Sequence, residues 1–166
     1  MSSARALLLC SVLLAACASK QTQEPPTPDA ASFEATAYPV LLRDCAFPAC
    51  HASNERFFQV YGPGRVRLNP DPMLDVYQPA TQAELQLSYE RARSMLSSPK
   101  VEDSLLLRKP LEASAGGAAH KGDDELGRNV YRTKQDAGYQ TLLQWAASMG
   151  TQTVPVMPAA MPGAQQ

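Results

Sequence analysis

The chain has 166 residues, with 15 Lys and Arg against 16 Asp and Glu and a formal net charge of −1. This balance, with no basic stripe interleaved with aromatic residues, gives no electrostatic case for binding nucleic acid. Between a polar N-terminal stretch and a Pro/Ala-rich tail lie roughly 120 residues, enough for one small domain with a single hydrophobic core.

Residues 1–16 predict a secretory signal peptide. Arg5 precedes an apolar run that is too short for a membrane-spanning helix of about 20 residues. The run ends in Leu-Ala-Ala-Cys at positions 14–17. This ending resembles the bacterial lipobox, which implies cleavage before Cys17 and a diacylglycerol on its sulfur. Ala18 rather than Asp follows, which in that class implies the outer membrane. The alternative is an ordinary signal peptide with a chance cysteine.

The polar, proline-rich residues 17–31 predict a lipidated flexible tether, and the Pro/Ala-rich residues 151–166 predict a disordered tail. The folded domain is therefore expected over residues 32–150. A protein anchored in this way lies on a membrane without spanning it, with its domain in the periplasm or at the cell surface.

The domain is predicted to be mainly helical. A first helix is expected to begin near Ser32 and end before Cys45, kinked or delayed by Pro39. Residues 57–68 predict a short hairpin or a structured loop around the Gly-Pro-Gly turn at 62–64. The apolar spacing on the first helix gives a buried side formed by Phe33, Ala37, Val40 and Leu41.

Two further helices carry clear start and stop signals. Residues 81–96 begin with a capping box of Thr81 and Glu84, and residues 136–149 end before Gly150. Between them lie a short apolar run at 103–107 and a loop at 115–127 that holds four glycines and His120. The expected inward residues are Leu85, Tyr89, Ala92 and Leu96 on the earlier helix, and Tyr139, Leu142, Leu143 and Ala146 on the later one.

Residues 45–51 read Cys-Ala-Phe-Pro-Ala-Cys-His. Two thiols followed at once by an imidazole are what covalent haem attachment requires, because each thiol adds to one haem vinyl group and the histidine ligates the iron. Four residues separate the cysteines, where two are usual, so the intervening loop must bulge. With Cys10 removed in the signal and Cys17 lipidated, Cys45 and Cys50 remain as one local pair outside the cytoplasm, where haem is attached to cysteines.

From about residue 33 to 150 the layout resembles a c-type cytochrome domain. The resemblance implies a small cytochrome c-like helical fold, one covalent haem c held by Cys45 and Cys50, and His51 as the proximal iron ligand. In that family the sixth ligand usually comes from a loop before the last helix. His120 lies in such a loop, which has no methionine, so His51 and His120 are the expected axial pair. Two histidine ligands hold the haem potential lower than a methionine would.

A haem also needs apolar neighbours and partners for its propionates. Arg65 and Arg67, beside the Gly-Pro-Gly turn, are the candidate propionate contacts, with solvent-exposed arginines as the alternative. The residues expected to line the pocket, or else to form plain core, are Phe57, Phe58, Tyr61, Leu85, Tyr89 and Trp145.

Two other interpretations of the same residues stay open. Cys45 and Cys50 could form a disulfide that braces a small domain in an oxidising compartment. Zinc could be bound by these two cysteines with His51 and His120, although adjacent Cys50 and His51 suit one tetrahedral ion poorly.

The leading functional expectation is a membrane-anchored monohaem electron carrier with an unknown redox partner protein, rather than an enzyme. If His120 leaves the iron free, an open site for a diatomic gas or peroxide follows. The alternative is a haem-free lipoprotein that acts as a protein-interaction module of the cell envelope. No Gly-x-Ser-x-Gly elbow and no His-Glu-x-x-His motif supports a hydrolase.

Overall fold

We describe a computed structural model over residues 25–73, 75–97, 99–118, 120 and 129–148. The described residues form helices joined by long loops, and their one β-type pairing is an isolated bridge between Leu111 and Tyr131. This confirms the prediction of a mainly α domain. The helical elements in chain order are α1 (Ala30–Ser32), η1 (Phe33–Ala37), α2 (Tyr38–Asp44), α3 (Gln82–Ser94), η2 (Val101–Asp103), α4 (Leu105–Arg108), η3 (Ala113–Ala115) and α5 (Ala137–Ala147).

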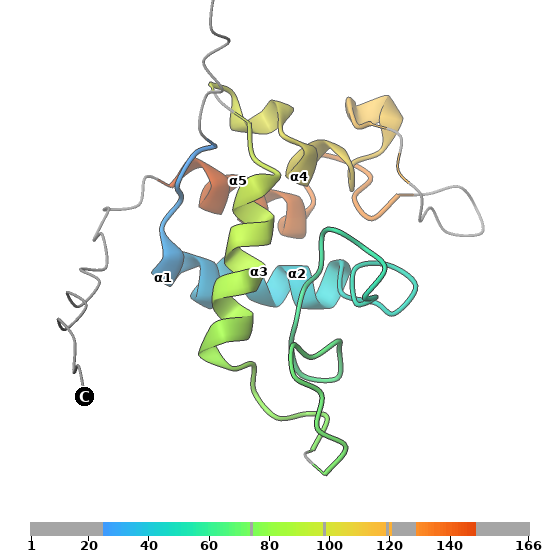
Figure 1. Cartoon of the computed structure of the whole chain (residues 1–166). Coiled ribbons are helices and arrows are strands. Elements are labelled where there is room, and N and C mark those ends of the chain that lie inside the picture. The colour runs from blue at the N-terminus through green and yellow to red at the C-terminus, as the bar shows by residue number, and fades with distance from the viewer. Residues whose placement is uncertain (1–24, 74, 98, 119, 121–128, 149–166) are drawn as a thin grey trace, which may run out of the picture.

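The elements α1, η1 and α2 follow one another without a break and together form the first helical segment (Figure 1). Pro39 has no amide hydrogen to donate to the preceding turn. The chain adapts just before it, because η1 is a π-helical stretch in which the Tyr38 amide donates to the Phe33 carbonyl five residues back. The helical segment begins at Ala30, so Pro39 does not delay it, and the winding changes locally before the proline. Pro39 is formally in the first turn of α2, but it lies inside the continuous helical segment, so one carbonyl of the preceding turn lacks the amide donor that another residue would supply.

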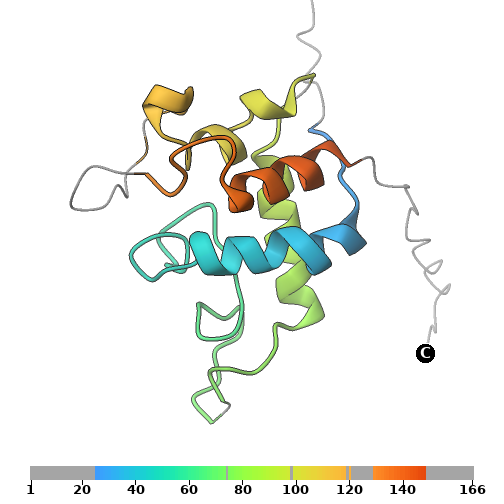
Figure 2. The same ribbon diagram turned by 180° about the vertical axis from the view of Figure 1, so that it is seen from behind.

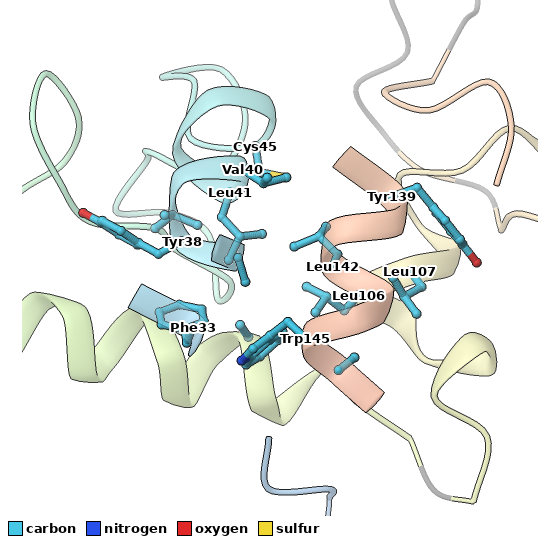
Figure 3. Packing of buried hydrophobic residues seen from close by; sticks show 14 of the residues in the cluster. Phe33, Tyr38, Val40, Leu41, Cys45, Leu106, Leu107, Tyr139, Leu142 and Trp145 are labelled. Atoms are coloured by element: carbon cyan, nitrogen blue, oxygen red, sulfur yellow. The ribbon is translucent and has the colours of Figure 1, made fainter. Parts of the chain in front are cut away.

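The first helical segment packs against α5, and α3 crosses both (Figures 1 and 2). Their shared core is aromatic at one end: the ring of Phe33 lies 5.1 Å from that of Trp145 and 5.5 Å from that of Tyr89. Figure 3 shows Phe33 beside Trp145, with Leu41 and Leu142 facing one another between α2 and α5. Burial of these apolar side chains is the main force that holds the elements together.

Residues 25–29 pack against the domain instead of standing away from it. Arg93 donates to the Pro26 carbonyl at 3.2 Å, and the Tyr89 hydroxyl donates to the Pro28 carbonyl at 2.8 Å. The indole of Trp145 donates to the Asp29 carbonyl at 3.1 Å. Residues 25–29, which the sequence assigned to the tether, thus contact the helices through three side chains that bind their backbone carbonyls.

Residues 45–81 connect α2 to α3. Within this connection residues 57–68 form a structured loop, the second of the two forms expected for them. A narrow turn is closed by the Gly62 amide, which donates to the Val66 carbonyl at 3.2 Å. The loop is fixed to α3 by an ion pair in which Arg67 binds both carboxylate oxygens of Glu84, at 2.8 and 2.9 Å. Glu84 also completes the predicted capping box with Thr81.

The later elements close the other side of the core. α4 places the buried Leu106 and Leu107 near α5, and Figure 3 shows these two side chains beside Leu142 and Tyr139. The short run predicted at 103–107 thus becomes η2 followed by α4. In the part of the chain that the structure describes, no helix has both the length and the apolar character needed to cross a bilayer.

Candidate functional site

The loop that carries Cys45, Cys50 and His51 is closed by its own backbone. The His51 amide donates to the Cys45 carbonyl at 3.1 Å, so the two ends of the heptad meet. Within it the Phe47 carbonyl accepts from the amides of Cys50 and Ala52, at 2.8 and 3.0 Å. The two additional residues of the stretched spacing are therefore taken up in a compact turn, and this turn follows directly on the last residue of α2.

The two cysteines carry free thiols in very different surroundings. Cys45 is buried at the end of α2, and Cys50 is half-buried. Burial raises the pKa of the Cys45 thiol to about 12, with smaller contributions from the nearby Asp44 and Cys50. Cys45 therefore stays a neutral thiol at physiological pH, packed in the hydrophobic core.

The imidazole of His51 is oriented by one hydrogen bond. Its Nδ1 lies 2.8 Å from the Phe58 carbonyl, and since a carbonyl can only accept, Nδ1 carries the proton. Nε2 is then the unprotonated nitrogen, as a metal ligand must be. Burial lowers the pKa of His51 below its ordinary value, and the hydrogen bond to Phe58 opposes this only in part. His51 is thus a neutral, pre-oriented imidazole.

His120 comes close to His51 although 69 positions separate them in the chain. The two ring centres are 6.0 Å apart, and the ring planes are within 20° of parallel. A nearly parallel pair at this distance lies within the usual range of aromatic contacts, about 4.5–7 Å. The Nδ1 atom of His120 is buried and has no hydrogen-bond partner among the described residues.

The two predicted propionate contacts lie in different places. The Arg65 guanidinium stands 5.2 Å above the ring of Phe47, inside the loop between the cysteines, and its Nε is buried without a hydrogen-bond partner among the described residues. Arg67 points instead toward α3, where it binds Glu84 and the carbonyls of Gln78 and Pro79. Arg65 therefore borders the cysteine loop, and the hydrogen bonds of Arg67 fix a neighbouring loop.

Among the aromatic residues expected around a haem, Phe58 is the one that contacts His51, edge to face with ring centres 4.8 Å apart. Phe57 is exposed and lies under the guanidinium of Arg91. Tyr89 and Trp145 belong to the aromatic core between the helices. These last two are core residues, which was the alternative interpretation of their spacing.

One pair near the site was not predicted. The Tyr131 hydroxyl donates to the Asp44 carboxylate at 2.8 Å, directly beside Cys45. Tyr131 is buried, and burial together with the neighbouring Cys45 and Asp44 raises the pKa of its hydroxyl far above the ordinary value. The two residues are 87 positions apart, and no local sequence pattern links them.

The structure does not gather a zinc site from these residues. Within the described part of the chain, no group of three or more His, Cys, Asp or Glu side chains converges as ligands for a metal ion. Cys45, Cys50, His51 and His120 all belong to that part. What remains is a pair of imidazoles, with the two cysteines in the loop that immediately precedes one of them.

No family model, no curated protein and no solved structure matches this chain. The site is accordingly interpreted from its own residues. The predicted lipidation residue, Cys17, lies outside the described residues.

Proposed function

We propose that this protein is a membrane-anchored, monohaem c-type electron carrier of the bacterial envelope. Cys45 and Cys50 would hold the haem through thioether bonds, with His51 and His120 on opposite sides of its iron. A cytochrome c-like arrangement is part of the proposal. It is supported by the packing of the first helical segment on α5 and by the position of His120 between α4 and α5. The bound group would supply a one-electron Fe(III)/Fe(II) couple.

The observation that carries the proposal is the placement of the two histidines. The two imidazoles are half-buried and their centres are 6.0 Å apart, which is close enough for both to serve as ligands of one metal ion. The tautomer of His51 is fixed by the Phe58 carbonyl, and the buried Nδ1 of His120 has no hydrogen-bond partner among the described residues. A polar atom left without a partner in the interior costs about 1–3 kcal/mol, and ligation or a donor from a bound group removes that cost.

The remaining residues fit the same group. Cys45 and Cys50 lie in one turn and would supply the two thiols for addition across two vinyl groups. Each addition would break one S–H bond and the π bond of one vinyl group, and would form one C–S and one C–H bond. The Nε of Arg65 is buried beside this turn and has no hydrogen-bond partner among the described residues, which makes Arg65 a suitable partner for a propionate. Because Arg67 is bound to Glu84, we assign the propionate to Arg65 alone.

The decisive measurement is the absorption spectrum of the protein exported in a host that attaches haem. We expect a Soret band that stays with the polypeptide after acid–acetone extraction, and a mass increased by one haem. A colourless protein that is two hydrogens lighter than its reduced form would reject this proposal and support the haem-free interaction module with a Cys45–Cys50 disulfide.

The ligand assignment is tested separately. His120→Ala should turn a low-spin reduced spectrum toward high spin while the haem stays covalently attached, whereas His51→Ala should strongly reduce haem incorporation. His120→Met is the matched control, because a thioether can ligate the same position and should raise the reduction potential. An unchanged spectrum in His120→Ala would remove His120 from the iron.

A further inference from the structure

We propose that residues 68–73 and 75–78, named here the acidic loop, form a docking surface for a protein partner that offers an apolar pocket rimmed by Lys or Arg. The surface would point away from the membrane. The proposal does not depend on haem; it uses the proposed lipid anchor at Cys17 only to orient the domain.

The acidic loop exposes more apolar surface than a connecting loop needs. Met73 is 89% exposed, Tyr77 73%, Val76 61% and Leu68 38%. These four are half of the large apolar side chains found exposed among the described residues, and they lie within eleven positions. Large apolar side chains gathered on one exposed element mark an interaction site more often than scattered ones do.

The base of the loop is firmly attached, so these side chains are held outward. The Gly64 amide donates to the Val76 carbonyl at 2.7 Å, and Arg67 donates to the Gln78 carbonyl at 3.1 Å. Glu84 accepts from the Leu68 amide at 2.9 Å and pairs with Arg67. A loop fixed at its base loses little entropy on binding, which favours its use as a preorganised contact.

The charge of the loop selects the kind of partner. Asp71 and Asp75 are both exposed, and no Lys or Arg stands between residues 68 and 78. The nearest cation in sequence, Arg67, is already paired with Glu84. Such a surface is repelled by an anionic membrane and by the same loop of a second copy, whereas Lys or Arg around an apolar pocket would complement it.

The geometry of the anchor separates the acidic loop from the membrane. Arg93, at the C-terminal end of α3, holds the carbonyls of Pro25 and Pro26, while Glu84, at the opposite end, holds the base of the loop. Figure 1 shows the entering chain and this loop at opposite ends of α3. Helix α3 has 13 residues, which span about 20 Å.

Cys17 precedes Pro25 by eight positions, a reach of at most about 29 Å when fully extended. The acidic loop continues beyond the far end of α3. It would touch the membrane that holds Cys17 only if the tether ran nearly straight along the whole domain. A partner outside the membrane is therefore the occupant we assign.

The test uses the full-length lipidated protein in living cells, with the photo-crosslinking residue p-benzoylphenylalanine in place of Met73. We expect one discrete protein adduct. The double variant Asp71→Lys and Asp75→Lys should reduce the amount of this adduct at least tenfold. The matched control is Glu102→Lys with Asp103→Lys, two exposed acidic residues on η2, which should leave the adduct unchanged. Once the adduct is identified by mass spectrometry, reversing the charge of its rim should restore crosslinking to the Lys variants.

The other outcomes overturn the proposal. An adduct with lipid, or an adduct of twice the chain mass, would contradict it. So would an adduct that the Asp71 and Asp75 reversals leave unchanged. As a background control the photo-crosslinker is placed at the exposed Glu34, and an adduct at Met73 no stronger than this background would also contradict the proposal. Circular dichroism checks that each variant folds. The absorption spectrum is recorded in parallel, so that loss of docking is distinguished from failure of the haem assignment.

Discussion

At the scale of single residues, neighbouring side chains decide the chemistry of this site. Cys45 and Cys50 are five positions apart, yet one is enclosed by the core and the other borders solvent. His51 is set by a single carbonyl, that of Phe58, which decides which ring nitrogen remains free. A residue can thus be suited to ligation before any ligand is present.

The difference between the cysteines predicts different reactivity in haem-free, reduced protein. Cys50 should react with N-ethylmaleimide at least tenfold faster than Cys45, because burial keeps the Cys45 thiol protonated and inaccessible. Mass spectrometry of peptides after timed labelling measures the two rates. In urea the rates should become equal. Equal rates under native conditions would show that Cys45 is not enclosed.

A second prediction concerns Gly117, three positions before His120. A Cβ atom at Gly117 would collide with the backbone carbonyl of Leu111, which cannot turn aside as a side chain would. Gly117→Ala should therefore lower the free energy of unfolding by about 2–3 kcal/mol and shift His120 away from His51. Urea unfolding measures the loss, and in haem-loaded protein a rise in high-spin character reports the shift.

Gly116→Ala is the control for that experiment. Its φ of +94° strains any other residue, but a Cβ there meets no atom of the described residues within 4 Å. We expect a cost of about 1–2 kcal/mol with the low-spin spectrum retained. If both variants behave alike, the contact between Gly117 and Leu111 does not position His120.

At the scale of elements, Glu84 links α3 to the loop before it. Its carboxylate is 2% exposed, and burial alone would raise its pKa. The hydrogen bonds from Arg67 and from the amides of Thr81 and Leu68 outweigh burial and lower the pKa to about 2. The stability that this group contributes is present above pH 4.5, its ordinary pKa, and is lost as the pH falls toward 2.

Glu84→Gln should therefore reduce stability by about 3 kcal/mol at pH 7, because it leaves the Arg67 charge without its partner. The variant should also lose much less stability than the parent protein between pH 4.5 and 2.5, which chemical denaturation at several pH values measures. Glu90→Gln, on the same helix, removes a half-exposed partner 3.6 Å from Arg93 and should cost less than 1 kcal/mol. Equal costs would mean that the buried pair has no special role.

The helices were largely predictable from sequence, because their signals are local. The capping box of Thr81 and Glu84 marked the start of α3, and the spacing of Tyr139, Leu142 and Ala146 marked the buried face of α5. The burial of Glu84 was not predictable, since it depends on Arg67 arriving from a loop 17 residues away. Local sequence patterns predict where a helix begins and which face is buried. They do not predict which distant side chains form hydrogen bonds and ion pairs with it.

The candidate site divides in the same way. The cysteine loop could be recognised because its residues are adjacent in sequence. The approach of His120 to His51 was an expectation carried by resemblance, and no periodicity or spacing could supply a distance. No sequence pattern pointed to Tyr131, because its contact with Asp44 joins two segments that are 87 positions apart in the chain.

At the scale of the whole molecule, stability depends on the contact between the first helical segment and α5. Trp145 is the one tryptophan of the chain and lies at the centre of this contact, 2% exposed. Trp145→Ala should lower the free energy of unfolding by about 3–5 kcal/mol, since it opens a large cavity beside Phe33 and Tyr89. Denaturation followed by circular dichroism measures this loss.

Trp145→Phe is the matched variant. It keeps most of the ring volume but removes the indole donor to Asp29, so a smaller loss is expected, about 1–2 kcal/mol. If Trp145→Ala costs less than 1 kcal/mol, the docking of α5 on the first helical segment is not what holds the domain together.

The two ends of the ordered domain are joined: the Asp29 amide donates to the Ser148 hydroxyl at 3.1 Å, beside the bond between Trp145 and the Asp29 carbonyl. A mechanical pull on the preceding chain would first load these bonds and the grip of Arg93 and Tyr89 on the proline carbonyls. The turn that holds Cys50 and His51 lies outside that line of force. If the proposed lipid anchor holds, tension from the membrane would therefore be taken up by these bonds without disturbing the paired imidazoles.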